Sequence, residues 1–469
     1  MKKLNIFYIC LLTFLASCSD FGDINENPNA PTFVGTETLL TSAQRSVSSV
    51  VGSALATVWS QHMAEITYTE TSRYQDVIQD FNGWYTGPLA NLEQIITLNT
   101  DEDTKGEVLS GGSNNNQIGV AMILQAYFFQ NIVDRWGPLP FTEALKGTEV
   151  LLPAYDSEET IYNALFTMLK DGAGMLDGGS VTGDIILGGD TNEWKKFANT
   201  LRALMAIRIA DVNPSKGQSE FNDAVNAGIM TSTVAYDYLA ETNNQNPWFA
   251  RFITRTDYAI SDVLYNYLVE TNDPRINSFA DPAASTGTIQ PMPYGLENSG
   301  VQPTDVSFPN STYVKAQDAD IPIFSETQIM FMMAEAAARG WTSGDAESLY
   351  NDAIAASMNQ WGISDADAIA AFVAQDNVKY DAANWKKSIG EQKWVALFTQ
   401  GYEAWAEWRR LDYPLLQVAE APLNPSEGIP LRFIYPNSES TLNTANYEAA
   451  VQMIGGTDTD GARLWWDVN

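Results

Sequence analysis

The chain has 469 residues and a formal net charge of −32, from 26 basic and 58 acidic side chains. Nucleic-acid phosphates repel such a chain, so the charge excludes nucleic acid as a ligand and disfavours any strongly anionic one. The two cysteines are Cys10 and Cys18, and Cys10 falls in a segment that we expect to be removed. An internal disulfide and a cysteine-based zinc site are therefore excluded.

The first residues are typical of an export signal with a lipid attachment site. Two lysines precede an apolar run, Leu4 to Leu15, which is too short to cross a bilayer. Small residues then stand directly before Cys18, as at a cleavage site. We expect residues 1–17 to be a lipoprotein signal peptide, Cys18 to carry the lipid and residues 18–36 to be a flexible tether. A plain signal peptide and a membrane anchor are the alternatives.

Helical periodicity dominates residues 37–469, which we expect to form a single domain. Apolar residues recur at helical spacing over Leu39–Ile66 and Ile118–Trp136. The dipeptide Gly137-Pro138 should end the second of these stretches. Ser157, which stands before two glutamates, suits the N-cap of a further helix.

The clearest helix pair is predicted over Ser325–Trp361. Ser325 and Gln328 have the spacing of a capping box, and Gly340 stands where the first helix must end. Asp345 then begins the second helix. Two helices of this length with a tight turn resemble one tetratricopeptide unit.

Between the helical blocks lie long segments rich in Pro, Asn, Ser and Gly. The longest covers residues 243–321 and contains one helical patch, Tyr258 to Val269. Gly106–Asn116 and Gly172–Asp190 are also rich in glycine. Long ordered loops on a helical scaffold are where binding residues tend to lie, although they can also be simple insertions.

The usual catalytic and metal-binding patterns are absent from the sequence. It has no GxxxxGK[ST] loop and no HExxH motif, and His62 is its only histidine. His62 stands in an apolar stretch and is interpreted as a structural residue. Asp101–Gly106 is a poor match to a calcium loop, because Lys105 stands at a ligand position. We therefore predict no cofactor, no metal and no catalytic residue, although a carboxylate pair among 58 acids stays open.

Aromatic side chains are abundant, with 13 Trp, 20 Tyr and 20 Phe. Most must pack in the core, and Trp394, Trp405, Trp465 and Trp466 are interpreted so. Other aromatics stand among amides and carboxylates, where flat faces suit sugar rings; Tyr313 is one of them. The predicted glycan-binding residues are Tyr68, Tyr74, Trp84, Tyr85, Trp248, Tyr294 and Phe308.

Five stretches resemble the SusD/RagB family of Bacteroidetes surface lipoproteins. They are the tether motif Asn27–Thr32, the helix end and turn Asp134–Ala144, the helix pair around Ala334–Ala336, the helix Glu391–Tyr413 and the segment Leu431–Pro436. In the fourth stretch, the run Trp-Ala-Glu-Trp matches the SusD-like subgroup. The resemblance follows the chain in order.

The resemblance implies a mostly α, SusD-like fold in which tetratricopeptide-like helix pairs form a scaffold and long loops form the ligand face. It also implies a lipid-anchored outer-membrane protein that faces the exterior. Such a protein captures oligo- or polysaccharide without catalysis and delivers it to a partner SusC-type TonB-dependent transporter. A surface-tethered glycoside hydrolase or lyase, and a helical protein adaptor, are the alternatives.

Overall fold

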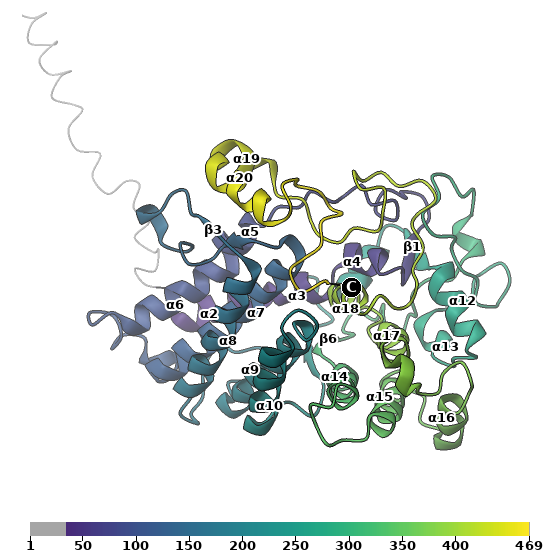
Figure 1. Ribbon diagram of the computed structural model, residues 1–469, viewed down its shortest axis with the longest axis horizontal. Helices are drawn as coiled ribbons and strands as arrows, with labels where there is room; N and C mark the ends of the chain where they lie inside the picture. Colours follow the sequence, from purple (N-terminus) through teal and green to yellow (C-terminus); the bar gives the residue numbers. More distant parts are fainter. Residues whose placement is uncertain (1–33, 469) are drawn as a thin grey trace, which may run out of the picture. The chain divides into compact units, whose positions relative to one another are not determined.

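The computed structural model describes residues 34–468, and Figure 1 shows how their helices and loops are arranged. The expected signal peptide, Cys18 and nearly all of the expected tether lie outside the described residues. From Thr36 onward the chain forms one compact unit. Among the described residues, no helix combines the length and the apolar character needed to span a bilayer.

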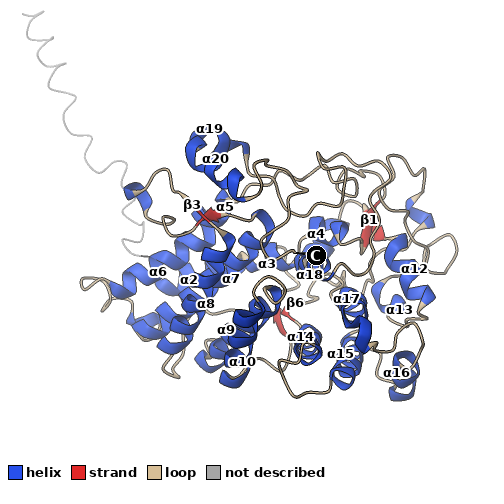
Figure 2. Ribbon diagram, viewed as in Figure 1, coloured by secondary structure: helices blue, strands red, loops and turns tan. Residues whose placement is uncertain are grey.

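Helices make up most of the regular structure, which confirms the mostly α fold class (Figure 2). The α-helices are α2 (Thr36–Arg45), α3 (Val47–Val51), α4 (Ala54–Trp59), α5 (Asn82–Trp84), α6 (Ala90–Thr100), α7 (Asn114–Trp136), α8 (Glu158–Met175), α9 (Thr191–Arg208), α10 (Pro214–Ala227), α11 (Pro247–Phe252), α12 (Asp262–Glu270), α13 (Ile276–Phe279), α14 (Glu326–Ala338), α15 (Ala346–Gln360), α16 (Ala366–Val373), α17 (Trp385–Ala396), α18 (Gly401–Leu411), α19 (Asn437–Leu442) and α20 (Thr444–Met453). Short 3-10 or π turns are η2 (Tyr85–Leu89), η3 (Leu109–Gly111), η4 (Gly147–Glu149), η5 (Pro303–Asp305) and η6 (Ala382–Asn384).

Three short antiparallel strand pairs join distant parts of the described chain. The strands are β1 (Met63–Glu65), β2 (Leu139–Pro140), β3 (Tyr155–Asp156), β4 (Val234–Tyr236), β5 (Tyr258–Ile260) and β6 (Ile321–Phe324). β1 pairs with β5, β2 with β3 and β4 with β6. The β4–β6 pair joins the two ends of the long loop region, and the β1–β5 pair ties its interior to a segment that precedes it.

The helices pack mainly against their neighbours in sequence. Contacts run from α6 to α10, and α14 then contacts α9, α15 and α17. In Figure 1, α10, α14, α15 and α16 lie along the lower edge of the view, whereas the chain after α18 crosses the upper part as loops that carry the short helices α19 and α20.

Several predicted helix boundaries are confirmed. α7 ends at Trp136, and Gly137 follows it with a φ of +85° that favours glycine. The Ser157 hydroxyl accepts the Thr160 backbone N–H and so caps α8. In the predicted helix pair, Ser325 caps α14 in the same way.

The stretch 39–66, expected to be helical from its apolar spacing, is helical only as far as Trp59. The chain divides there into α2, α3 and α4 and then enters β1, which pairs with β5. A Cβ at Gly52, just after α3, would lie 2.3 Å from a ring carbon of Pro247, so this close approach requires glycine. The helical patch expected at 258–269 likewise begins with a strand, β5, before α12.

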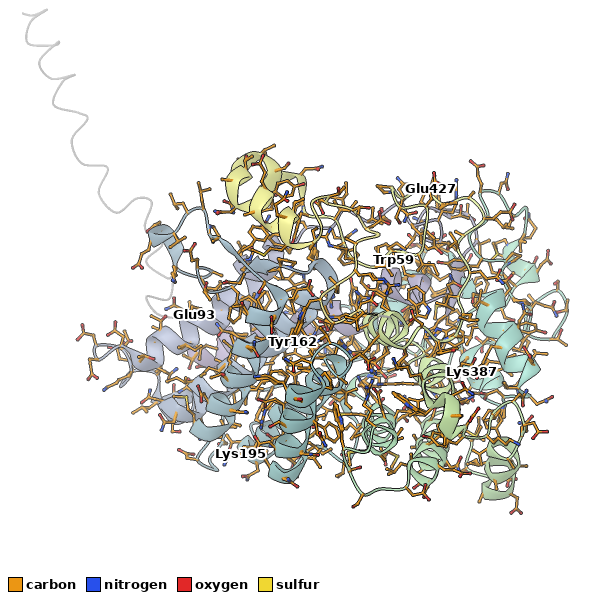
Figure 3. The ribbon with its side chains drawn as sticks, in the orientation of Figure 1. Trp59, Glu93, Tyr162, Lys195, Lys387 and Glu427 are labelled. Carbon is orange, nitrogen blue, oxygen red and sulfur yellow. The ribbon has the colours of Figure 1, made fainter. Side chains whose placement is uncertain are left out.

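Large aromatic side chains fill the core. Trp59 and Tyr162 lie among other side chains in the interior (Figure 3). Trp59 packs edge-on against Trp405, with ring centroids 5.2 Å apart. Trp394 and Trp466 are also buried, which confirms the packing role predicted for these tryptophans.

Candidate functional site

The long loop region contributes one wall of a pocket of about 300 Å³, which we call the loop pocket. The other walls come from β4, β6, the end of α15 and the turn before α18. The pocket is lined by Thr233, Ala235, Asn246, Trp248, Tyr313, Val314, Asp320, Ile321, Pro322, Gln360, Trp361 and Thr399. Aromatic rings, amides, hydroxyls and one carboxylate thus share one hollow, the mixture expected of a small-molecule site.

Asn246 fixes the loop wall of this pocket. Its side-chain oxygen accepts the Trp248 backbone N–H at 2.6 Å and caps α11. Its side-chain amide donates to the Ala319 carbonyl at 2.5 Å, and its backbone N–H donates to Gln317 at 2.8 Å. The start of α11 is therefore tied to the segment that leads into β6.

The three aromatic side chains of the pocket differ in exposure. Trp248 is fully buried and Trp361 is 5% exposed, whereas Tyr313 is 42% exposed. The Tyr313 and Trp361 ring centroids are 6.2 Å apart. Tyr313 is therefore the ring with area free to stack on a ligand, whereas the two tryptophans are buried in the pocket wall.

Trp248 and Trp361 also carry buried indole N–H groups that find no hydrogen-bond partner among the described residues. A buried donor left unpaired costs about 1–3 kcal/mol. Each of these donors would gain from an acceptor brought by water or by a ligand.

Asp320 sets the charge of the loop pocket. Partial desolvation, followed by the nearby Asp237 carboxylate, raises the pKa of Asp320, and Asp318 acts in the same direction. The Asp320 carboxylate accepts the Tyr238 backbone N–H at 3.3 Å. The potential at this side of the pocket is therefore negative.

A second hollow, of about 510 Å³, adjoins the loop pocket along α14 and α15, and we call it the helix groove. The two hollows share Thr233 and Gln360. The helix groove is lined by Thr233, Glu326, Thr327, Met330, Asp352, Ala355, Ala356, Asn359 and Gln360. Together the two hollows offer room for several linked units of a polymer.

A separate hollow of about 650 Å³ lies between α6, the 140–153 loop and α19, and we call it the Tyr85 groove. Tyr85 lines it and donates its hydroxyl to the Pro140 carbonyl at 2.7 Å. Leu151, Leu152 and Leu442, which are all exposed, also line this groove. Its walls are more aliphatic than those of the loop pocket and less suited to sugar stacking.

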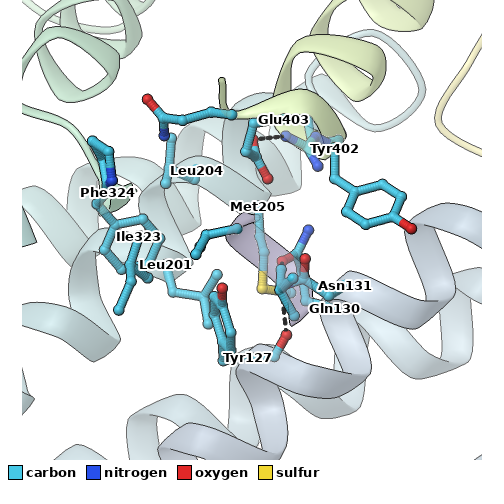
Figure 4. Close-up of a pocket in the computed structure, with 15 residues that line it drawn as sticks. Tyr127, Gln130, Asn131, Leu201, Leu204, Met205, Ile323, Phe324, Tyr402 and Glu403 are labelled. Carbon is cyan, nitrogen blue, oxygen red and sulfur yellow. Dashed lines mark hydrogen bonds and ion pairs between the residues drawn. The ribbon is translucent and has the colours of Figure 1, made fainter. Parts of the chain in front are cut away.

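The hollow drawn in Figure 4 is of a different kind. It lies between α7, α9, β6 and α18 and has a volume of about 30 Å³. Tyr127, Leu201 and Glu403 are among its lining residues. This volume holds about one water molecule and excludes a sugar.

The structure does not gather all the predicted glycan-binding residues in one place. Tyr68 is 56% exposed, and the Arg255 guanidinium lies 4.4 Å from its ring centroid. Tyr74 and Tyr294 are buried neighbours with centroids 6.4 Å apart. Phe308 is half-buried against Phe252.

Trp84 and Tyr85 lie elsewhere, against α7. The Trp84 ring centroid is 5.8 Å from that of Phe128, and the Tyr85 centroid is 5.9 Å from that of Phe129. Of the predicted residues, Trp248 lines the loop pocket and Tyr85 lines the Tyr85 groove. The binding roles of all seven stay predictions.

Sequence patterns do not single out Trp361, Gln360 or Asp320 as site residues. In the sequence, Gln360 and Trp361 are typical of the end of a helix, because a glycine follows them. In the structure this Gly362 has a φ of +79°. Long-range contacts bring them to the pocket: β4 pairs with β6 beside Asp320, and the Ser278 hydroxyl of the loop region donates to the Trp361 carbonyl at 2.7 Å.

Metal binding finds no support in the described part of the chain, where no group of three or more His, Cys, Asp or Glu side chains could hold an ion. In the 101–106 loop, the Lys105 ammonium pairs with Glu102 at 2.6 Å.

Two chitin-binding proteins are among the similar solved structures. The first is 26% identical, covers 93% of this chain and 100% of its own, and has a TM-score of 0.80. The second, a SusD homologue from Flavobacterium johnsoniae, is 24% identical over 92% of this chain and 97% of its own, with a TM-score of 0.74. A SusD homologue from Bacteroides fragilis is 22% identical over 93% of this chain and 100% of its own, with a TM-score of 0.81.

No curated protein sequence matches this chain. A family model for SusD-like proteins, described as starch-binding and associating with the outer membrane, matches residues 28–436. Because this match covers most of the chain, the protein belongs to the SusD-like family.

Proposed function

We propose that this protein captures an oligo- or polysaccharide at the outer surface of the cell and delivers it to a SusC-type TonB-dependent transporter. A lipid on Cys18 would hold it to the outer membrane. The observation that carries the proposal is the family match over residues 28–436, because that family is described by starch binding and outer-membrane association. A chitin-binding relative with 26% identity supports a glycan as the ligand.

The loop pocket supplies the chemistry for such a ligand. The exposed Tyr313 ring would stack on the apolar C–H face of a sugar, while the exposed Gln360 and Asp320 side chains lie where hydroxyl groups would meet them. Binding without turnover fits the family's description as binding proteins. The proposed role is therefore capture and transfer, with no bond broken.

Glycan affinity of a Tyr313→Ala variant tests this assignment. We expect about tenfold weaker binding, measured by calorimetry or affinity electrophoresis on starch and chitin oligosaccharides, because the stacking surface is lost. Tyr68→Ala is the comparison variant, since Tyr68 is similarly exposed and is itself a predicted glycan-binding residue, but does not line the loop pocket.

The outcomes separate the alternatives. A loss in Tyr68→Ala without one in Tyr313→Ala would move the site to the Tyr68 surface. New reducing ends, released by the wild-type protein from a bound glycan, would favour the tethered hydrolase, with Asp320 and Asp237 as the carboxylates to substitute first. If no glycan bound, the proposed function would fail.

A further inference from the structure

We infer that the loop pocket and the helix groove form one extended site for a glycan chain whose sugars carry no negative charge. This inference rests on the proposed function and adds the class of ligand. It is carried by the charged side chains that line the two hollows, which are all acidic.

The combined lining contains Asp320, Glu326 and Asp352, but no lysine, arginine or histidine among the described residues. Two further carboxylates, Asp237 and Asp318, lie near enough to act on Asp320. A uronate or sulfate placed here would meet repulsion that no lining cation offsets.

Two cationic side chains near the loop pocket bind other groups of the protein. The Arg251 guanidinium stacks on the buried Trp248 ring, 4.9 Å from its centroid, and donates to the Gly52 carbonyl at 2.9 Å. The Lys315 ammonium pairs with Asp281 at 3.5 Å. Neither side chain lines either hollow.

The continuity of the two hollows argues for a chain over a single sugar. Thr233 and Gln360 border both, so a ligand stacked on Tyr313 can continue past them onto α14 and α15.

The helix groove offers both apolar and polar contacts. Met330, Ala355 and Ala356 form an apolar floor, and Asn359 and Asp352 offer polar atoms beside it. An uncharged polymer meets both requirements of such a groove, apolar contact and hydrogen bonding.

A matched ligand pair tests the inference. Wild-type protein is first offered uncharged oligosaccharides (maltoheptaose, chitohexaose and xylohexaose) and carboxylated ones (hexagalacturonate and hexamannuronate). The best uncharged ligand with free primary alcohols is then compared with the same ligand oxidised to carboxylates at those alcohols. We expect the oxidised form to bind about tenfold more weakly at low ionic strength.

A double variant, Asp320→Asn with Asp352→Asn, tests whether the loss of affinity on oxidation of the ligand comes from charge repulsion. Asparagine keeps the size of both side chains and can still accept the Tyr238 N–H, so thermal unfolding should be unchanged. We expect the affinity of the oxidised ligand relative to the uncharged one to rise severalfold, because the variant removes the repulsion while any lost hydroxyl contact weakens both ligands alike.

The two proposals fail in different ways. A carboxylated glycan that binds wild-type protein as tightly as the best uncharged one would overturn the inference and leave the proposed function standing. A penalty of unchanged size in the double variant would also overturn it. Absence of binding to every oligosaccharide would overturn the proposed function and this inference with it.

Discussion

His62 illustrates how burial sets the role of a single side chain. Its Nε2 donates to the Trp394 carbonyl at 2.9 Å, and its ring lies 4.9 Å from the Trp394 ring. Burial lowers the pKa of His62 to about 3, and the hydrogen bond to Trp394 opposes part of that shift. The imidazole is therefore neutral in the folded protein, as suits a structural histidine.

Because the pKa of His62 is lower in the folded than in the unfolded protein, the free energy of unfolding falls as the pH is lowered. Because His62 titrates near 6.5 when unfolded and near 3 when folded, protonation favours the unfolded state as the pH falls below 6.5. Between pH 7 and pH 5, we expect His62 to remove about 2 kcal/mol of unfolding free energy. Urea unfolding of the wild type and of His62→Gln at both pH values measures this, and equal losses in the two proteins would contradict it.

At the same scale, the role of His62 was predictable and the exposure of Trp248 was not. A lone histidine in an apolar stretch is most simply accommodated by burial. Trp248 stands in a polar, turn-rich segment, yet the Tyr258 ring and the Arg251 guanidinium pack against it and it is fully buried. Which loop covers which aromatic is decided by long-range packing, which local composition does not record.

At the scale of the element, α14 has only half of the predicted capping box. The Ser325 hydroxyl accepts the Gln328 backbone N–H at 3.1 Å, but the Gln328 side chain donates to Glu403 of α18 at 3.1 Å. The tertiary contact therefore takes the place of the reciprocal cap. Local spacing could predict the first bond and could not predict the second.

Ser325→Ala should cost about 1 kcal/mol of stability, because it removes the hydrogen bond that caps α14. Ser46→Ala is the control, since Ser46 stands at the N-cap of α3 without a side-chain capping bond. Denaturant unfolding of both variants measures the difference. An equal effect on the two proteins would show that the Ser325 cap adds nothing.

At the scale of the whole molecule, the helix order and the interior tryptophans could be predicted, while the site could not. Periodicity locates α7 and the α14–α15 pair, because apolar residues recur there at helical spacing. The loop pocket arises where β4 pairs with β6 and brings the end of α15 opposite Tyr313. That pairing joins Val234 to Phe324, ninety residues further along the chain, and leaves no local signal.

The C-terminal segment also packs against helices that are distant from it in the sequence. The Trp466 indole is fully buried and donates to Asp134 of α7 at 3.0 Å, and the Tyr162 hydroxyl of α8 donates to the same carboxylate at 2.5 Å. We expect Trp466→Ala to cost about 3–5 kcal/mol, because it leaves a cavity between these helices and removes one partner of Asp134. Trp465 is a half-buried neighbour of Trp466, and we expect Trp465→Ala to cost clearly less unfolding free energy in the same measurement. Equal losses of unfolding free energy in the two variants would contradict this prediction. They would show that the burial of Trp466 and its hydrogen bond to Asp134 add no extra stability.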